Sequence, residues 1–155
     1  MKNLKREIPY RKAQLTDLVE IDRKLTELAR EAYRTSHSPY SGFRVGAAAI
    51  LDDGTIMTSS NQESEVFPSG MCAERILLYK FQSDFPDRKI AAVAIASEQN
   101  HKPAEREVYP CGGCAQVFID TEKRQQHPIR LIMCGSETCT IIDSAVYLLP
   151  FAFEL

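Results

Sequence analysis

Residues 45–59, VGAAAILDDGTIMTS, consist of two short apolar runs on either side of Asp52-Asp53-Gly54. An Asp-Gly turn between two such runs is a sequence signal of a β-hairpin, because these residues accept the backbone conformation of a tight turn. The pattern therefore predicts an antiparallel pair of strands, Val45 to Leu51 and Thr55 to Ser59.

Segments with helical spacing lie on both sides of this hairpin. Apolar residues between Ala13 and Tyr33 recur at helical spacing with charges on the other face, which predicts a long amphipathic helix. The segment from Ser36 to Phe43, SHSPYSGF, is rich in turn formers and predicts a loop. After the polar loop Asn61 to Gly70, helical spacing resumes in MCAERILLYKF, so that Cys72 lies at a helix start.

The second half of the chain continues the alternation of strands and helices. Lys89 to Ser97 is a nearly unbroken apolar run, the pattern of a strand that is covered on both faces. A further helix is predicted from Cys111 to Glu122. The remaining predicted elements are strands at Arg130 to Met133 and Thr140 to Ile142 and a short helix at Ser144 to Leu149. Five strands interleaved with helices predict a layered α/β fold around a mixed sheet, in a single domain over residues 1–155.

Composition and charge exclude several classes of partner. The chain of 155 residues is 44% hydrophobic and 26% charged, which is typical of a soluble globular protein. Its formal net charge of −2 provides no broad basic field for a phosphate backbone. Residues 1–10, MKNLKREIPY, carry no apolar run that would serve as a signal peptide, and no stretch reaches the ~20 residues of a membrane span. We expect a cytoplasmic protein that binds neither nucleic acid polymers nor membranes.

The cysteines need an explanation that does not involve disulfides. There are five, an odd number, and a chain without an export signal is exposed to reducing thiol buffers. Cys134 and Cys139 lie in or beside apolar runs and are expected in the core. Cys72, Cys111 and Cys114 each lie at a predicted helix start.

Cys111-Gly112-Gly113-Cys114 places two thiols at i and i+3, on one face of a first helical turn, where they can chelate one ion. On its own this pair also fits a redox dithiol or half of a structural zinc knuckle. The chain has no second CxxC, and its histidines are not spaced like the remaining ligands of a zinc finger. Cys72 supplies a third thiol, and three thiolates with one open position are typical of a catalytic zinc.

The residues that follow Cys72 fit the same interpretation. Free backbone N–H groups and the positive end of the dipole at a helix start favour thiolate over thiol. Three thiolates leave a negative charge on the zinc site, which weakens the acidification of water, and Arg75 is close enough in sequence to offset it. A glutamate on a helix is ordinarily a solvated charge, whereas the offset of two residues between Cys72 and Glu74 indicates catalysis.

Four separated motifs together resemble the small cytidine deaminases. They are, in chain order, PYSGFRVGAA at residues 39–48, Asn61-Gln62-Glu63, Cys72-Ala73-Glu74-Arg75 and Pro110-Cys111-Gly112-Gly113-Cys114. The signature of zinc deaminases is a His or Cys two residues before a Glu that acts as general acid and base, followed later by PCxxC. The likeness extends from the Ser36 loop to Leu148-Leu149-Pro150.

This resemblance implies a three-layer α/β/α fold with a mixed five-stranded sheet. It also implies hydrolytic deamination of cytidine or deoxycytidine to uridine or deoxyuridine and ammonia, in pyrimidine salvage, with Zn²⁺ as cofactor. Cys72, Cys111 and Cys114 would hold the zinc, while Glu74 would shuttle protons between water and the base.

The resemblance also implies roles in substrate binding and assembly. Phe43 would pack on the pyrimidine, Asn61 and Glu63 would bind ribose hydroxyls, and Ala73 would contact the substrate. Family members of this size usually form homotetramers, and Phe153 would reach the site of a neighbouring subunit.

Several positions depart from the family pattern and leave the substrate open. Phe67-Pro68-Ser69-Gly70 replaces a stretch like tyrosine-glycine-leucine-threonine, Ser64 replaces an asparagine, and Ala115 replaces an arginine. The substrate could therefore be a modified nucleoside or a nucleoside-like compound. The cysteines would also fit two functions of a different class, a non-catalytic binding module stabilised by zinc and thiol redox chemistry through the CxxC pair.

Overall fold

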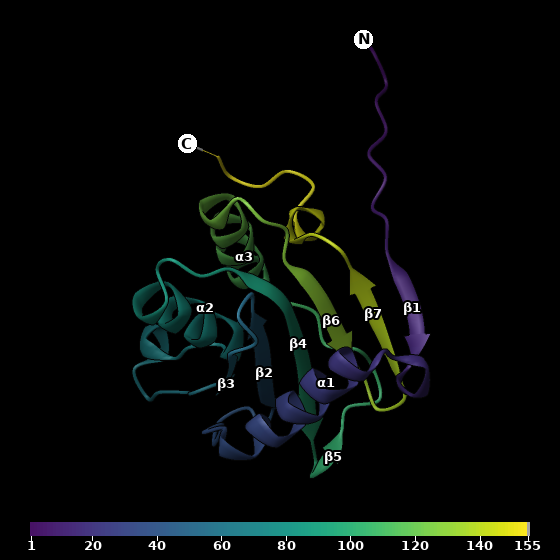
Figure 1. Ribbon diagram of the computed structural model, residues 1–155. Coiled ribbons are helices and arrows are strands. Elements are labelled where there is room, and N and C mark those ends of the chain that lie inside the picture. The colour runs from purple at the N-terminus through teal and green to yellow at the C-terminus, as the bar shows by residue number, and fades with distance from the viewer. Residues whose placement is uncertain (155) are drawn as a thin grey trace.

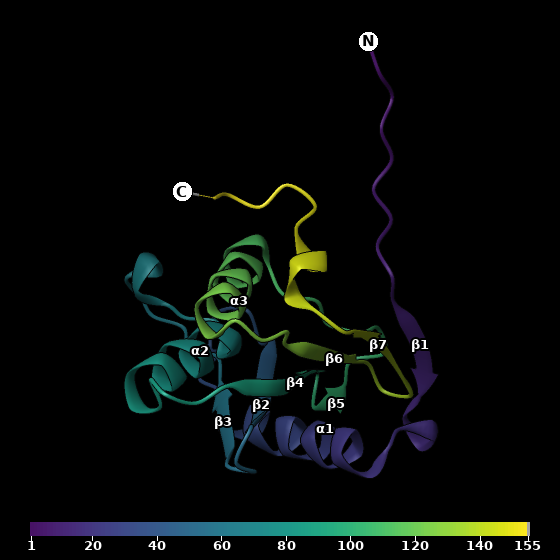
Figure 2. The same cartoon turned by 45° about the horizontal axis from the view of Figure 1, so that its top comes forward.

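A computed structural model of the protein, which describes residues 1–154, has one sheet between two layers of helices (Figure 1). Helix α1, Glu20–Ala32, covers one face, while α2, Ala73–Asp84, and α3, Gly112–Gln125, cover the other. In Figure 2, α1 lies below the sheet and α2 and α3 lie above it. The predicted three-layer α/β/α architecture is confirmed.

The sheet is mixed, as predicted, but it has seven strands rather than five. The strand order is β1-β7-β6-β4-β2-β3, and β5 pairs with β4. Strands β4 and β6 are parallel, and the other pairs are antiparallel. The bounds are β1 Arg11–Gln14, β2 Arg44–Leu51, β3 Ile56–Ser60, β4 Ile90–Gln99, β5 Lys102–Pro103, β6 Arg130–Cys134 and β7 Thr138–Ile142.

The predicted helix from Ala13 to Tyr33 is wrong at its beginning. Residues 11–14 form β1 on the edge of β7, and the Leu15 N–H donates to the Glu137 carbonyl at 2.8 Å, which continues the contact with the β6–β7 hairpin. A 3-10 turn at Leu15–Asp17 follows, and α1 begins only at Glu20. Pairing with a strand more than a hundred residues away therefore overrides the local helical pattern.

Three further 3-10 turns complete the chain. They lie at Tyr33–Thr35, Phe67–Ser69 and Ala145–Leu148, and the last of them occupies the place of the predicted C-terminal helix. Across residues 1–154, none of the helices has both the length and the apolar character needed to cross a membrane.

Two apolar clusters fill the spaces above and below the sheet, and strand β4 contributes to both. Val93 and Ile95 join the cluster under α2 and α3, while Ala92, Ala94 and Ala96 join the one against α1. This alternation is the period of two expected for a strand that is buried on both faces.

Close packing of α1 on the sheet depends on Gly46 in β2. A Cβ atom at this position would lie 2.0 Å from the Ala29 carbonyl oxygen and 2.6 Å from the Tyr33 backbone nitrogen. Only a residue without a side chain allows α1 to approach β2 this closely.

The topology brings the starts of α2 and α3 to one edge of the sheet. Strand β3 is antiparallel to β2, which is antiparallel to β4, so β3 and β4 end at the same edge. Helix α2 follows β3, and α3 follows β4 and the short β5. Both helices therefore present their N-terminal N–H groups at this edge, which is where ligands bind in many α/β folds.

Candidate metal centre and active site

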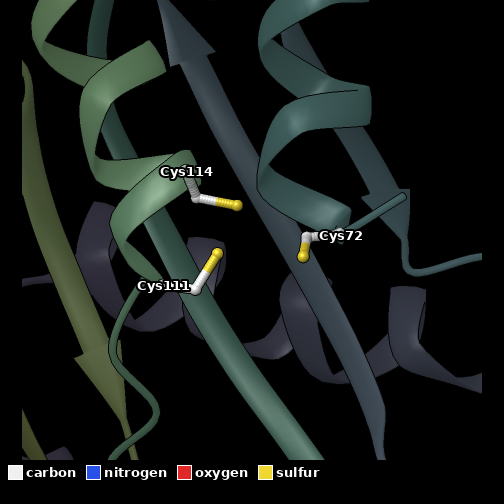
Figure 3. Close-up of side chains that lie close together, drawn as sticks. All are labelled: Cys72, Cys111 and Cys114. Atoms are coloured by element: carbon white, nitrogen blue, oxygen red, sulfur yellow. The ribbon is translucent and has the colours of Figure 1, made fainter. Parts of the chain in front are cut away.

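Three thiols lie together where α2 and α3 begin (Figure 3). Cys72 is the N-cap of α2, Cys111 is the N-cap of α3, and Cys114 lies in the first turn of α3. Their Sγ atoms all lie within 4.8 Å of one another. The structure thus brings together the three cysteines that the sequence singles out.

This donor set fits a zinc ion with an open coordination position. Zn²⁺ in proteins is usually four-coordinate, and a closed structural site takes all four ligands from the protein. In the part of the chain that the structure describes, the cluster has three members, and no further His, Cys, Asp or Glu belongs to it. The arrangement therefore resembles a catalytic centre more than a closed structural site.

The other two cysteines are confirmed as core residues. Cys134 and Cys139 are buried in the cluster against α1, on the opposite face of the sheet from the three thiols. They belong to β6 and β7, and they pair directly across these strands.

The thiols of the cluster share their protons unequally. Hydrogen bonding from Cys114, together with the Arg75 guanidinium, lowers the pKa of Cys72 to about 5. The same hydrogen bond and burial raise the pKa of Cys114, so this thiol keeps its proton to a higher pH. A metal must displace this proton, because the thiolate is the form that coordinates. Metal binding should therefore release protons.

Arg75 is the cation of this site. The nearby sulfurs of Cys72 and Cys114 raise the pKa of Arg75 against the opposing effect of burial. The Nε atom of Arg75 is buried and has no hydrogen-bond partner within residues 1–154. A guanidinium near two of the three sulfurs can offset part of their negative charge.

Glu74 is buried beside the thiols rather than solvated. It lies in the first turn of α2, and only 4% of the residue is exposed. Burial, assisted by the nearby Cys72 thiolate, raises the pKa of the Glu74 carboxyl to about 7. A group with a pKa near neutrality can both accept and donate a proton, which is the property that general acid–base catalysis requires.

A cavity of about 380 Å³ opens next to the thiol cluster. Its lining includes Cys72 together with Asn61 and Glu63. Phe67 and Gly70, from the loop that departs from the family pattern, also line it. The cavity therefore joins the metal centre to the predicted ribose-binding residues.

Asn61 and Glu63 hold the loop that precedes β2. The Asn61 Oδ1 atom accepts hydrogen bonds from the Ser36 hydroxyl at 2.6 Å and from the Val45 N–H at 2.8 Å. Glu63 accepts from the Tyr40 N–H at 2.9 Å and from both the N–H and the hydroxyl of Ser41. These bonds fix the wall of the cavity, and the Ser41 hydroxyl lowers the pKa of Glu63, so its carboxylate is charged at neutral pH.

The structure places Phe43 in a second hollow, not among the lining residues of the cavity that contains Asn61 and Glu63. Phe43 packs partly against the core and lines a hollow of about 890 Å³ with Ser97, Val108 and Tyr109. Ala73 is the first residue of α2, so its N–H has no partner within the helix. Its carbonyl accepts a hydrogen bond from the Ser59 hydroxyl at 2.7 Å.

Phe153 does not line the cavity or the hollow of its own chain. It is 70% exposed, at the end of a C-terminal segment that runs past α3 (Figure 1). Its backbone N–H and carbonyl both hydrogen-bond with the Gln116 side chain of α3, at 3.1 and 3.0 Å. This anchoring leaves the ring free to contact another molecule.

Two features of the site have no clear signal in the sequence. Ser41 takes part in three hydrogen bonds in the wall of the cavity. The motif at residues 39–48 contains Ser41, but nothing in the sequence distinguishes this serine from its neighbours. Ser97 is buried at the end of β4, and only the folded structure shows that its hydroxyl faces no partner within residues 1–154.

Comparison with known protein families adds independent information. A family model described as "Cytidine and deoxycytidylate deaminase zinc-binding region" matches residues 19–126, a span that includes all three clustered cysteines. A relative from Mycobacterium tuberculosis named cytidine deaminase is 33% identical over 130 residues, which cover 82% of this chain and 85% of the relative. A relative of the same name from Halalkalibacterium halodurans is 35% identical over 96 residues, 62% of this chain and 68% of the relative.

Solved structures agree with the sequence relatives. The crystal structure of a cytidine deaminase from Burkholderia pseudomallei is 30% identical, with a TM-score of 0.71, and the match covers 84% of this chain and 98% of that chain. The cytidine deaminase structure from Mycobacterium tuberculosis is 27% identical with a TM-score of 0.67, over 88% of this chain and 99% of that chain. The likeness thus covers nearly the whole of each solved chain.

Proposed function

The chain belongs to the cytidine and deoxycytidylate deaminase family, and from this premise we infer that it is a zinc-dependent hydrolase that deaminates cytidine. One observation carries this conclusion: a cluster of three thiols with no fourth protein ligand within residues 1–154 stands beside a buried glutamate with a pKa of about 7. Zinc in such a centre, when bound, lowers the pKa of a water molecule toward ~7 and so supplies a nucleophile for C4 of cytosine.

Glu74 performs the proton transfers in this proposal. Its carboxylate takes a proton from the water, delivers it to N3 of the base and then assists the departure of ammonia. Burial beside the cavity keeps solvent away from the carboxyl and holds its pKa near 7, so both protonation states are accessible during turnover. Cys72, Cys111 and Cys114 hold the metal, and Arg75 offsets their charge.

The direct test is turnover of cytidine by purified protein of known zinc content. Conversion of cytidine to uridine lowers the absorbance on the long-wavelength side of the pyrimidine band. It also releases one ammonia per turnover, so both products can be followed. We expect both signals from protein that contains one zinc per chain. Zinc-loaded protein that converts neither cytidine nor deoxycytidine would contradict the proposed function.

We further propose that Asn61 and Glu63 bind the ribose hydroxyls. Both line the cavity beside Cys72, and the Glu63 carboxylate is held in place by Tyr40 and Ser41. A fixed carboxylate at this position is a suitable acceptor for a hydroxyl, and a hydrogen bond to a charged group is worth about 1.5–3 kcal/mol.

Replacement of Glu63 by glutamine should therefore lower kcat/KM for cytidine about tenfold or more. The same change should matter far less for 2′,3′-dideoxycytidine, which lacks the hydroxyls that Glu63 would bind. The measurement is the ratio of kcat/KM for the two substrates in the parent and in Glu63→Gln. An equal loss of kcat/KM with both substrates would show that Glu63 stabilises the loop and does not bind the ribose hydroxyls.

The remaining proposed contacts involve the base and a second subunit. Phe43 packs on the pyrimidine, and the free N–H of Ala73 at the start of α2 binds the base. Phe153, exposed and anchored through its backbone to Gln116, completes the site of a neighbouring subunit in a homotetramer. A cavity of about 380 Å³ suits a free nucleoside rather than a polynucleotide.

A modified nucleoside is the second candidate substrate, because of where the unusual loop lies. Phe67 and Gly70 both line the cavity, and Phe67 is 87% exposed. A different loop in the cavity wall alters the shape that a substituent on the nucleoside meets. Turnover of substituted cytidines, compared with cytidine itself, separates the two candidates. The buried position of Glu74 beside the thiols argues against a binding module without catalysis.

A further inference from the structure

Ser97 has a buried hydroxyl for which the protein supplies no partner. The residue is 3% exposed, and its Oγ atom has no hydrogen-bond partner within residues 1–154. A buried polar group without a partner costs about 1–3 kcal/mol, and most such groups in proteins are satisfied. The Ser97 hydroxyl therefore requires an explanation, and a ligand in the adjacent hollow would provide the missing partner.

The side chain points toward the face of the sheet that carries the metal centre. Strand β4 sends Val93 and Ile95 to the cluster under α2 and α3, and Ser97 follows them with the same alternation. It pairs directly with Val45 of β2, whose N–H donates to Asn61. Ser97 thus lies one strand away from a residue of the cavity wall.

The hollow beside Ser97 is bounded by the chain that leads into the metal centre. The Ser97 carbonyl accepts a hydrogen bond from the Ala104 N–H at 2.9 Å, at the beginning of the segment that runs to Cys111. Val108 and Tyr109 of that segment line the hollow together with Phe43 and Ser97. Ser97 therefore lies on the side of the metal centre that includes the lead-in to Cys111 and the proposed stacking residue.

If the proposed function holds, the geometry of cytidine determines which of its groups lies nearest to Ser97. The reacting carbon, C4, must lie at the metal centre, and the ribose on N1 lies toward Asn61 and Glu63. N1 and C4 are on opposite sides of the six-membered ring, so the exocyclic amino group on C4 points away from the ribose. We place the hollow of Phe43, Ser97 and Tyr109 in this direction, because Tyr109 lies two residues before the ligand Cys111 and Phe43 is the residue proposed to pack on the base.

We propose that Ser97 Oγ accepts a hydrogen bond from the exocyclic amino group of the substrate and so contributes to selection of 4-aminopyrimidine nucleosides. A hydroxyl that has no partner in the free protein gains one when such a substrate binds, and a pyrimidine without the amino group leaves it unsatisfied. Selectivity of this kind arises because an analogue without the polar group leaves a buried group unpaired.

The test compares two ligands that differ only in the amino group, cytidine and the pyrimidin-2-one ribonucleoside with hydrogen at C4. Their Kd values are measured by calorimetry on zinc-loaded Glu74→Gln protein, with and without Ser97→Ala. Without the Glu74 carboxyl as proton carrier, both turnover of cytidine and addition of water to C4 of the analogue are strongly slowed. Loss of one neutral hydrogen bond should weaken cytidine about threefold to tenfold, while the analogue should change less than twofold. Ser97→Cys, which fills the same space but is a weak acceptor, should behave like Ser97→Ala.

Ser144→Ala is the matched control. The Ser144 hydroxyl donates to the buried Glu122 at 2.5 Å, so its removal should lower the Tm but leave the preference for cytidine unchanged. Equal weakening of both ligands by Ser97→Ala, or no change with either, would overturn the proposal. Failure of the parent to deaminate cytidine would refute the proposed function instead, and the comparison of Kd values would still decide the role of Ser97.

Discussion

Glu74→Gln is expected to lower kcat for cytidine by about 10²- to 10⁴-fold, the usual contribution of general acid–base catalysis, while the protein keeps its zinc. The carboxyl is 4% exposed, and burial holds its pKa at about 7, so it can cycle between its two protonation states at neutral pH. Glutamine has nearly the same shape but cannot take up or release the proton. KM should change much less than kcat, because the loss falls on the transition state.

Glu122→Gln is the matched control for this variant, since Glu122 is also a buried glutamate near one end of a helix. Its carboxylate accepts hydrogen bonds from the Ile129 N–H at 2.8 Å, the Ala145 N–H at 2.7 Å and the Ser144 hydroxyl. This variant should lower the Tm and keep a kcat near that of the parent. Zinc-loaded Glu74→Gln protein with parental kcat would show that Glu74 is not the proton carrier.

Local signals in the sequence were sufficient for most elements of the fold. The starts of α2 and α3 follow loops rich in turn formers, and the β2–β3 hairpin contains an Asp-Gly turn, so these boundaries depend on nearby residues. The two missed strands depend on other causes. Strand β1 forms because it pairs with β7, at the other end of the chain, and no local sequence pattern indicates that contact.

The sequence does not predict strand β5, because the turn before it uses unusual residues. Asn100 and His101 both have positive φ, 53° and 60°, and they connect β4 to β5 as a two-residue hairpin. This geometry is ordinarily signalled by Asn-Gly or Asp-Gly, and histidine at the second position hides it. The strand itself is two residues long, too short for any alternation to appear.

The metal cluster was predictable for a physical reason that does not extend to the rest of the site. The spacing of Cys111 and Cys114 indicates a metal site by itself, because it places two sulfurs on one face of a helix. Only the strand order determines that Cys72 meets them. The missing partner of Ser97 and the separate hollow of Phe43 are tertiary properties, which depend on every neighbour rather than on spacing.

Cys114→Ser is expected to remove most of the bound zinc and to lower kcat/KM for cytidine by about 10³-fold or more. Cys114 is fully buried, and its sulfur lies within 4.8 Å of both other thiols, so it is the ligand that solvent can replace least easily. A serine hydroxyl rarely gives up its proton near neutral pH, whereas the coordinating sulfur must be a thiolate. Loss of the activated water removes several kcal/mol of catalysis, and each ~1.4 kcal/mol corresponds to a tenfold change in rate.

Cys139→Ser distinguishes this effect from the general cost of placing a hydroxyl in the core. Cys139 is equally buried but belongs to the cluster against α1, away from the metal centre. It should lower the Tm while one zinc per chain and most of the activity are retained. Zinc content by mass spectrometry and kcat/KM are measured on both variants. If Cys114→Ser kept a full zinc complement and parental turnover, the three-thiol centre would be wrong; if Cys139→Ser lost zinc as well, the loss would report unfolding. The metal is located between α2 and α3 only if Cys114→Ser loses zinc and activity while Cys139→Ser retains both.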